Sequence, residues 1–109
     1  MTTKEKELEV LEEKEVDMDK DVLKLTSSIE IDGKEVTEIK YNLNRITGKT
    51  IRVNIQKLGR MEMVVPNIEF SPVLHAALFA EAAELDFHII EKLNVKDYTN
   101  AVSIVSNFM

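Results

Sequence analysis

The 109-residue sequence contains no cysteine and no tryptophan, and only three glycines and two prolines. Without cysteine there can be no disulfide framework and no thiolate metal site, and nothing indicates an oxidising compartment. No apolar run approaches the roughly 18 residues of a membrane span, and the opening MTTKEKELEV lacks the apolar centre of a signal peptide. We therefore expect a cytoplasmic protein with no membrane partner.

Positive charge is also scarce. Fourteen Lys and Arg residues against 20 Asp and Glu residues give a net charge of −6, which repels phosphate backbones, so we expect no nucleic-acid partner. Residues 1–24 hold nine acidic and five basic residues with few apolar ones. We interpret residues 1–24 as a charged, mostly disordered leader, the alternative being a solvated helix over residues 4–15. Residues 25–109 then form one domain.

Side chains that carry chemistry are few. His75 and His88 are the only histidines, and no carboxylate lies at a metal-ligand offset on a shared helix face. Glu84 precedes His88 by four residues, but the helix is expected to break at Leu85 and Asp86. No nucleophile motif is present, and the three glycines are too scattered to hold a phosphate. We predict no catalytic residue, no cofactor and no metal site, and therefore no enzyme.

The segment IEIDGKEV predicts a β-hairpin. Asp-Gly favours a two-residue turn because both positions need positive φ, and that turn sets Ile31 opposite Lys34 and Ile29 opposite Val36. Further along, the apolar positions shift parity, which requires a bulge near Thr37 and Glu38 or a bend. Two strands alone are marginal in water, so the hairpin must pack against helices or a neighbouring chain.

Residues 49–58 allow two interpretations. Ile51, Val53 and Ile55 alternate and are β-branched, which favours a strand. Ile51, Ile55 and Leu58, followed by Gly59, instead favour a short helix with a glycine stop. Propensity alone slightly favours the strand.

A helix over residues 72–85 is predicted by Ser71 as N-cap and Pro72 at the first helical position. It is apolar over most of its circumference, and a chain this short has little material to surround it. Its small residues form a stripe through which another copy could approach closely. We therefore predict self-association, giving a homo-oligomer, through Ala76, Ala80 and Ala83.

The last third of the chain predicts two more helical pieces. Residues 86–93 form a short helical turn with Phe87, Ile90 and Leu93 facing inward. Asn94 caps a final amphipathic helix that has Asp97 in its first turn. The expected fold is α+β, with an N-terminal β-hairpin followed by a small bundle of three to four helices.

Three segments, in this order, resemble the tail assembly chaperones of tailed bacteriophages. They are SSIEIDGKEVTEIKYNLNRITGKTI, PNIEFSPVLHAALFAEAAEL and LNVKDYTNAVSIVSNFM, and the resemblance covers roughly residues 25–109. The chain is similar to the short, non-frameshifted form of these chaperones. The resemblance favours a helix over residues 49–58, against the local alternation.

The resemblance implies a non-enzymatic protein of the host bacterial cytoplasm that is absent from the mature virion. Such a chaperone binds and solubilises apolar helices of the tape-measure protein and helps to recruit the tail-tube protein. A helix-in-groove contact would use the helix at 72–85 and the facing side of the final helix. The predicted client-binding residues are Leu74, Leu78, Phe79, Val102 and Val105. The alternatives are a structural tail component, such as a tube or connector subunit, and a small acidic regulator such as an antitoxin.

Overall fold

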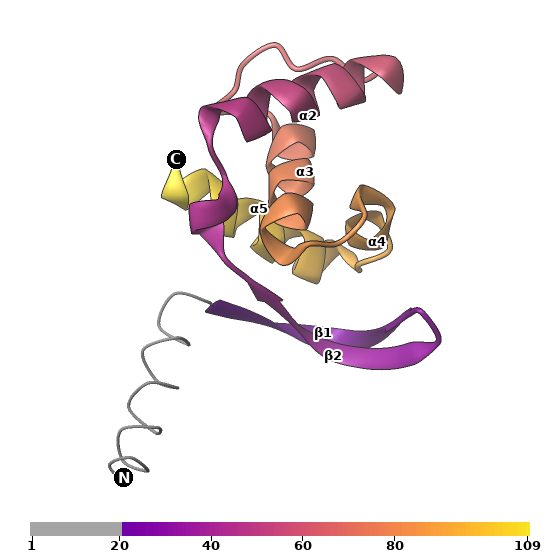
Figure 1. Ribbon diagram of the computed structural model, residues 1–109. Coiled ribbons are helices and arrows are strands. Elements are labelled where there is room, and N and C mark those ends of the chain that lie inside the picture. The colour runs from indigo at the N-terminus through magenta and orange to yellow at the C-terminus, as the bar shows by residue number, and fades with distance from the viewer. Residues whose placement is uncertain (1–20) are drawn as a thin grey trace, which may run out of the picture.

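A computed structural model describes residues 21–109, which form an α+β fold with a two-stranded antiparallel hairpin followed by four α-helices (Figure 1). This confirms the predicted fold class. The elements are β1 (Asp21–Ile31), β2 (Lys34–Tyr41), a 3₁₀ turn η1 (Leu43–Arg45), α2 (Gly48–Arg60), α3 (Pro72–Ala83), α4 (Phe87–Glu91) and α5 (Val95–Phe108).

The N-terminal boundary of the domain differs from the prediction. Residues 21–24, assigned to the leader from the sequence, belong to β1, and Leu23 is buried in the core. The rest of the predicted leader, residues 1–20, lies outside the described residues. Only Leu23 of these four residues is buried. One buried position among exposed neighbours gives no alternation of apolar and polar residues from which a strand could be predicted.

The hairpin has the predicted register. Asp32 and Gly33 adopt φ values of 52° and 81°, as a two-residue turn of this kind requires. Ile31 pairs with Lys34, and the other predicted pair, Ile29 with Val36, is also present.

The predicted bulge lies at the expected height of the hairpin but on the other strand. Between the pairs Lys24–Glu38 and Ile29–Val36, β1 contributes residues 25–28 and β2 contributes only Thr37. The extra residues therefore belong to β1. The apolar parity of β2 does shift, but this cannot reveal which strand carries the additional residues.

A contact with α5 accounts for this irregularity. The backbone N–H of Thr26, within the bulge, donates to both carboxylate oxygens of Asp97 at 3.0 Å, and the Thr26 hydroxyl donates to Asp97 Oδ2 at 3.1 Å. Asn94 adds a bond from its side-chain amide to the Thr26 hydroxyl at 2.9 Å. The bulge thus frees a backbone donor that the first turn of α5 satisfies.

Residues 48–60 form helix α2, as the family resemblance favoured and local alternation did not. The Thr47 hydroxyl caps the helix by accepting from Thr50 N–H at 3.3 Å. Leu58 is buried against α3, whereas a strand would have separated it from Ile51 and Ile55. Gly59 lies inside the last turn of α2 and does not stop it.

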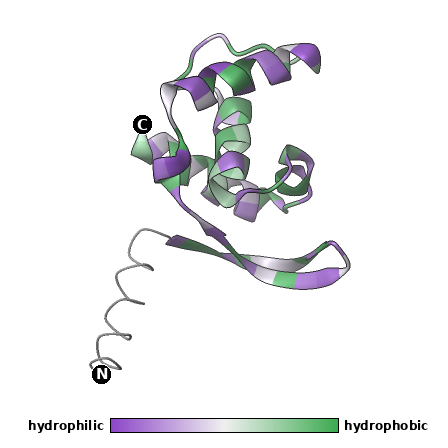
Figure 2. Ribbon diagram, in the orientation of Figure 1, coloured by the Kyte–Doolittle hydropathy of each residue, from purple (hydrophilic) through white to green (hydrophobic). Residues whose placement is uncertain are grey.

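Helix α3 is the centre of the core. It contacts α2, α4, α5, β2 and η1 (Figure 1), and Figure 2 shows hydrophobic colours along most of its length. The Asn42 N–H donates to the Ala82 carbonyl at 2.9 Å, which fixes the end of the hairpin to this helix. The chain therefore has enough material to surround α3, contrary to the sequence expectation.

The ends of α3, α4 and α5 follow local capping rules. Helix α3 ends at Ala83, two residues before the predicted end, because Glu84 takes a left-handed conformation and Leu85 N–H donates to Ala80 O at 2.8 Å. The Asn94 side chain caps α5 by accepting from Asp97 N–H at 2.8 Å, as predicted. Ile90 and Leu93 are buried as expected, whereas Phe87, which was also expected to face inward, is only half-buried.

Alkaline pH is expected to destabilise the fold through two tyrosines. Burial raises the pKa of Tyr41 and of Tyr98 above the usual value of about 10, with smaller contributions from Asp21 and Glu91 respectively. The folded state thus holds protons that the unfolded state releases, so the free energy of unfolding falls as pH rises above about 10. Tyr41→Phe and Tyr98→Phe should each flatten this fall in urea melts taken from pH 8 to 11. An unchanged slope in both variants would contradict the assignment.

Candidate functional site

Most residues predicted to contact a client lie inside the protein. Leu74, Leu78, Phe79 and Val105 have no exposed surface, and only Val102 is partly exposed. The prediction that they form a client-binding surface therefore needs correction, because α2, α5 and the hairpin already cover them.

The three alanines predicted to mediate self-association also differ in how far they are buried. Ala76 is fully buried and Ala80 is 3% exposed, while Ala83 is half-buried. The three alanines therefore do not form one open helix face that another copy could contact. Ala80 nevertheless lines an open groove, described next.

An open groove of about 380 Å³ lies between α2, α3 and α4, and we call it the α2–α4 groove. Its floor is built by Ala77 and Ala80 of α3, whose single-carbon side chains leave the space unfilled. Leu58, Leu85 and Phe87 provide apolar walls. The complete lining is Asn54, Lys57, Leu58, Arg60, Met61, Ala77, Ala80, Glu81, Leu85, Asp86, Phe87 and His88.

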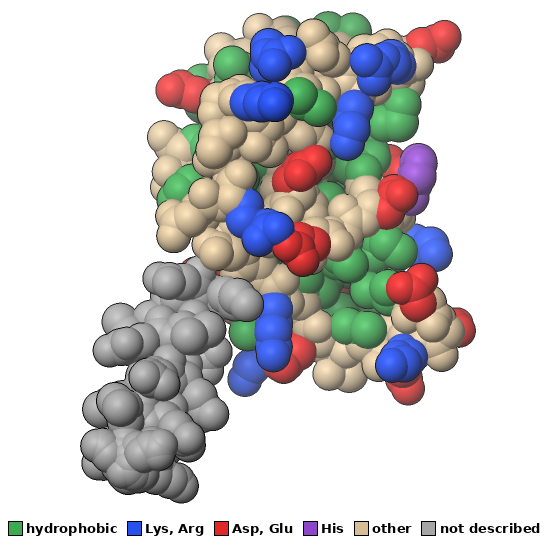
Figure 3. Space-filling model, in the orientation of Figure 1, with side chains coloured by type: hydrophobic (Ala, Val, Ile, Leu, Met, Phe, Trp, Pro, Cys, Tyr) green, Lys and Arg blue, Asp and Glu red, His purple; other side chains and the backbone are tan. Residues whose placement is uncertain are grey.

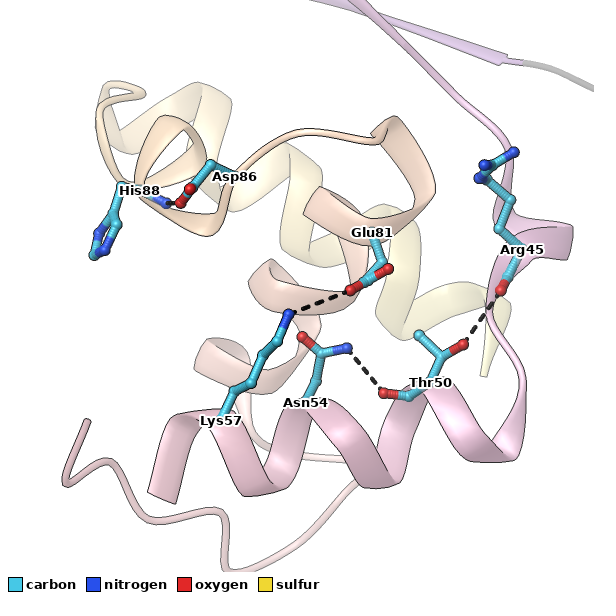
Figure 4. Close-up of polar contacts among 7 residues, drawn as sticks. All are labelled: Arg45, Thr50, Asn54, Lys57, Glu81, Asp86 and His88. Carbon is cyan, nitrogen blue, oxygen red and sulfur yellow. Dashed lines mark hydrogen bonds and ion pairs between the residues drawn. The ribbon is translucent and has the colours of Figure 1, made fainter. Parts of the chain in front are cut away.

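Polar contacts lie along the walls of the groove (Figure 4). Lys57 Nζ lies 3.7 Å from Glu81 Oε2 and so joins α2 to α3. The buried Asn54 side chain donates to Thr50 O at 2.8 Å within α2. Asp86 caps α4 by accepting from His88 N–H at 2.9 Å. The walls are thus formed by helices with defined ends.

A second hollow continues this surface toward the hairpin. It has a volume of about 580 Å³ and lies between the hairpin and the end of α3. Leu85 lines both hollows, so the two are neighbours on the surface. The apolar residues of the second hollow are Ile31, Val36, Ile39, Ala83 and Leu85.

Figure 3 shows one face of the molecule, with hydrophobic side chains between Lys and Arg side chains over α2 and Asp, Glu and His side chains below them. The sequence identified Leu58 and Phe87 as apolar positions, but it did not show that they meet in one groove with Met61. Sequence spacing shows which face of each helix is apolar, whereas the groove depends on how three helices are placed.

The loop between α2 and α3 carries other exposed apolar residues, including Val64 (79% exposed) and Phe70 (77%). It is held by His75, whose Nε2 lies 2.8 Å from the Ile68 carbonyl, and by the Ser71 hydroxyl, which donates to the Asn67 carbonyl. His75 thus has a structural contact, and His88 lies on the surface at the groove.

Within residues 21–109, no group of three or more His, Asp or Glu side chains is placed to hold a metal ion. No helix in that part of the chain is long and apolar enough to cross a membrane. Comparison with protein-family models, curated proteins and solved structures finds no match for this chain. The groove itself offers apolar contact, flanked by charge of both signs.

Proposed function

We propose that this protein is a helix-binding assembly chaperone whose client is the tape-measure protein of a bacteriophage tail. The observation that carries the proposal is the open apolar α2–α4 groove, beside a helix α3 whose residues 74–80 are buried. The order of sequence segments, which resembles tail assembly chaperones, supplies the identity of the client.

The dimensions of the groove suit a helical client. A volume of about 380 Å³ is in the range of small binding pockets and can take a few apolar side chains. An amphipathic helix presents such side chains at positions i, i+3 or i+4 and i+7. Contacts of this kind cover apolar surface and release it without a chemical step, which is what temporary protection during assembly requires.

The remaining parts of the proposal come from the resemblance. The chaperone would act in the host bacterial cytoplasm, help to bring the tail-tube protein to the tape-measure protein, and leave before the virion matures. Self-association, predicted from the apolar helix at 72–85, stays a prediction, but the alanine stripe is not an open surface for it. The half-buried Val102, on α5, is a secondary contact in this scheme.

Filling the groove should weaken client binding. Ala80→Leu places three additional carbons on the groove floor, and overpacking or steric exclusion of this size costs about 1–3 kcal/mol. We expect the affinity for a tape-measure fragment to fall about tenfold or more, and less of the fragment to stay soluble in co-expression. Val95→Leu on α5, where Val95 is 82% exposed and outside both hollows, is the matched control and should bind normally.

Circular dichroism and urea unfolding establish that each variant is folded. If Ala80→Leu does not fold, Met61→Glu tests the same groove, because Met61 is 38% exposed at its edge and a charge there does not disturb the core. A folded groove variant that solubilises the fragment as well as the wild type does would refute the assignment of the groove.

A further inference from the structure

The two sides of the α2–α4 groove carry opposite charge. Helix α2 contains four basic residues and no acidic one, whereas residues 81–91 contain four acidic residues and no Lys or Arg. Of these, Lys57 and Arg60 line the groove on the α2 side, and Glu81 and Asp86 line it on the α3–α4 side. Figure 3 shows this separation as blue side chains over α2 and red ones beyond the groove.

These charges are available to a ligand. The Lys57 and Glu81 side chains are 54% and 41% exposed, and their ion pair is long, at 3.7 Å (Figure 4). Exposed pairs of this kind contribute little to stability, so an incoming charged side chain can replace either partner. Arg60 and Asp86 are both exposed and have no ion pair within residues 21–109.

We infer that these charges fix the direction in which a helix lies in the groove, and this inference rests on the helix-binding function proposed above. The occupant is an amphipathic helix whose apolar stripe has acidic residues along one flank and basic residues along the other. Its acidic flank lies against Lys57 and Arg60, and its basic flank lies against Glu81 and Asp86.

The physical reason is geometric. When a helix with its apolar stripe on the groove floor is turned end for end, its two flanks exchange places. The apolar contacts are similar in both directions, but attraction on both sides becomes repulsion on both sides. Complementary charges at an interface mainly supply specificity and register in this way, and only part of the affinity.

The direction can be measured with two peptides of identical composition that differ only in which flank is acidic. Each carries a nitroxide on a single cysteine at its N-terminus, and the protein needs no change because it lacks cysteine. Paramagnetic broadening is then compared at the amides of Asn54 and Met61. These residues are separated by roughly 10 Å along α2, because an α-helix rises about 1.5 Å per residue.

We expect the two peptides to broaden opposite ends of the α2 side of the groove, at Asn54 in one case and at Met61 in the other. Each should prefer one direction by about tenfold at low salt, and by less at about 1 M salt, where the Debye length falls to about 3 Å. The exchange variant Lys57→Glu with Glu81→Lys keeps the net charge and the ion pair. It should reduce the preference to about threefold or less.

A third peptide with uncharged flanks separates this inference from the proposed function. It should bind wild type and the exchange variant equally and broaden the amides of both Asn54 and Met61. If it binds and the charged peptides show the same direction as each other, or none, the inference is refuted while helix binding stands. If no peptide binds, the proposed function fails.

Discussion

Asp97→Ala is expected to lower the free energy of unfolding by about 2–4 kcal/mol. The carboxylate has no exposed surface and accepts three hydrogen bonds from Thr26. Its removal leaves the N–H of Thr26 without its partner, which costs about 1–3 kcal/mol, and also removes a negative charge from the N-terminus of α5, worth about 0.3–1 kcal/mol. Urea unfolding followed by circular dichroism measures the loss.

Asp86→Ala is the matched control for this prediction. Asp86, like Asp97, is an acidic residue at the start of a helix, but it is exposed and caps α4 with its side chain, and loss of such a cap costs about 1 kcal/mol. Asp97→Asn keeps the shape of the side chain and one acceptor oxygen. Its loss in the free energy of unfolding should lie between those of the two alanine variants. Equal unfolding midpoints for Asp97→Ala and Asp86→Ala would mean that the contact between β1 and α5 does not stabilise the fold.

Phe79→Ala should be the most damaging single truncation, with a loss of about 3–5 kcal/mol. Phe79 is fully buried in α3, and its ring centroid lies 5.1 Å from that of Tyr41, at an interplanar angle of 51°. Truncation thus leaves a cavity and removes an aromatic contact between the helix and the hairpin. The free energy of unfolding of a domain is only about 5–15 kcal/mol, and that of a small domain lies near the lower end. The variant should therefore be close to unfolding at 37 °C.

The chain provides a matched control in Phe70→Ala. Phe70 is 77% exposed on the loop before α3, and its truncation should change the free energy of unfolding by no more than about 0.5 kcal/mol. Thermal melts of the two variants side by side measure the difference. Similar melting temperatures would show that the buried Phe79 ring does not stabilise the core.

The parts of the fold that were predictable from sequence are those that local chemistry determines. Positive φ at Asp32 and Gly33 fixes the hairpin register. Ser71 and Asn94 stand at the N-cap positions of α3 and α5 as predicted, but only the Asn94 side chain makes a capping hydrogen bond. The strand interpretation of residues 49–58 failed because alternation over five residues is compatible with either structure, and burial of Leu58 against α3 decides for the helix.

The parts that were not predictable depend on contacts between distant residues. The bulge in β1 follows from a partner 71 positions away, Asp97, which no local pattern around Thr26 reveals. The groove likewise depends on the placement of α4 relative to α2. The sequence identified Ala80 as a small residue that lets another helix approach, but not that the chain buries most of that face itself.

The central position of α3 has a consequence for truncated chains. The elements that cover this helix come from both sides of it in the sequence: β2, η1 and α2 precede it, and α4 and α5 follow it. A chain that is cut between α4 and α5 therefore leaves one apolar side of α3 without cover. Such a fragment should be prone to aggregation, in the same way as the apolar helices that we propose as the client.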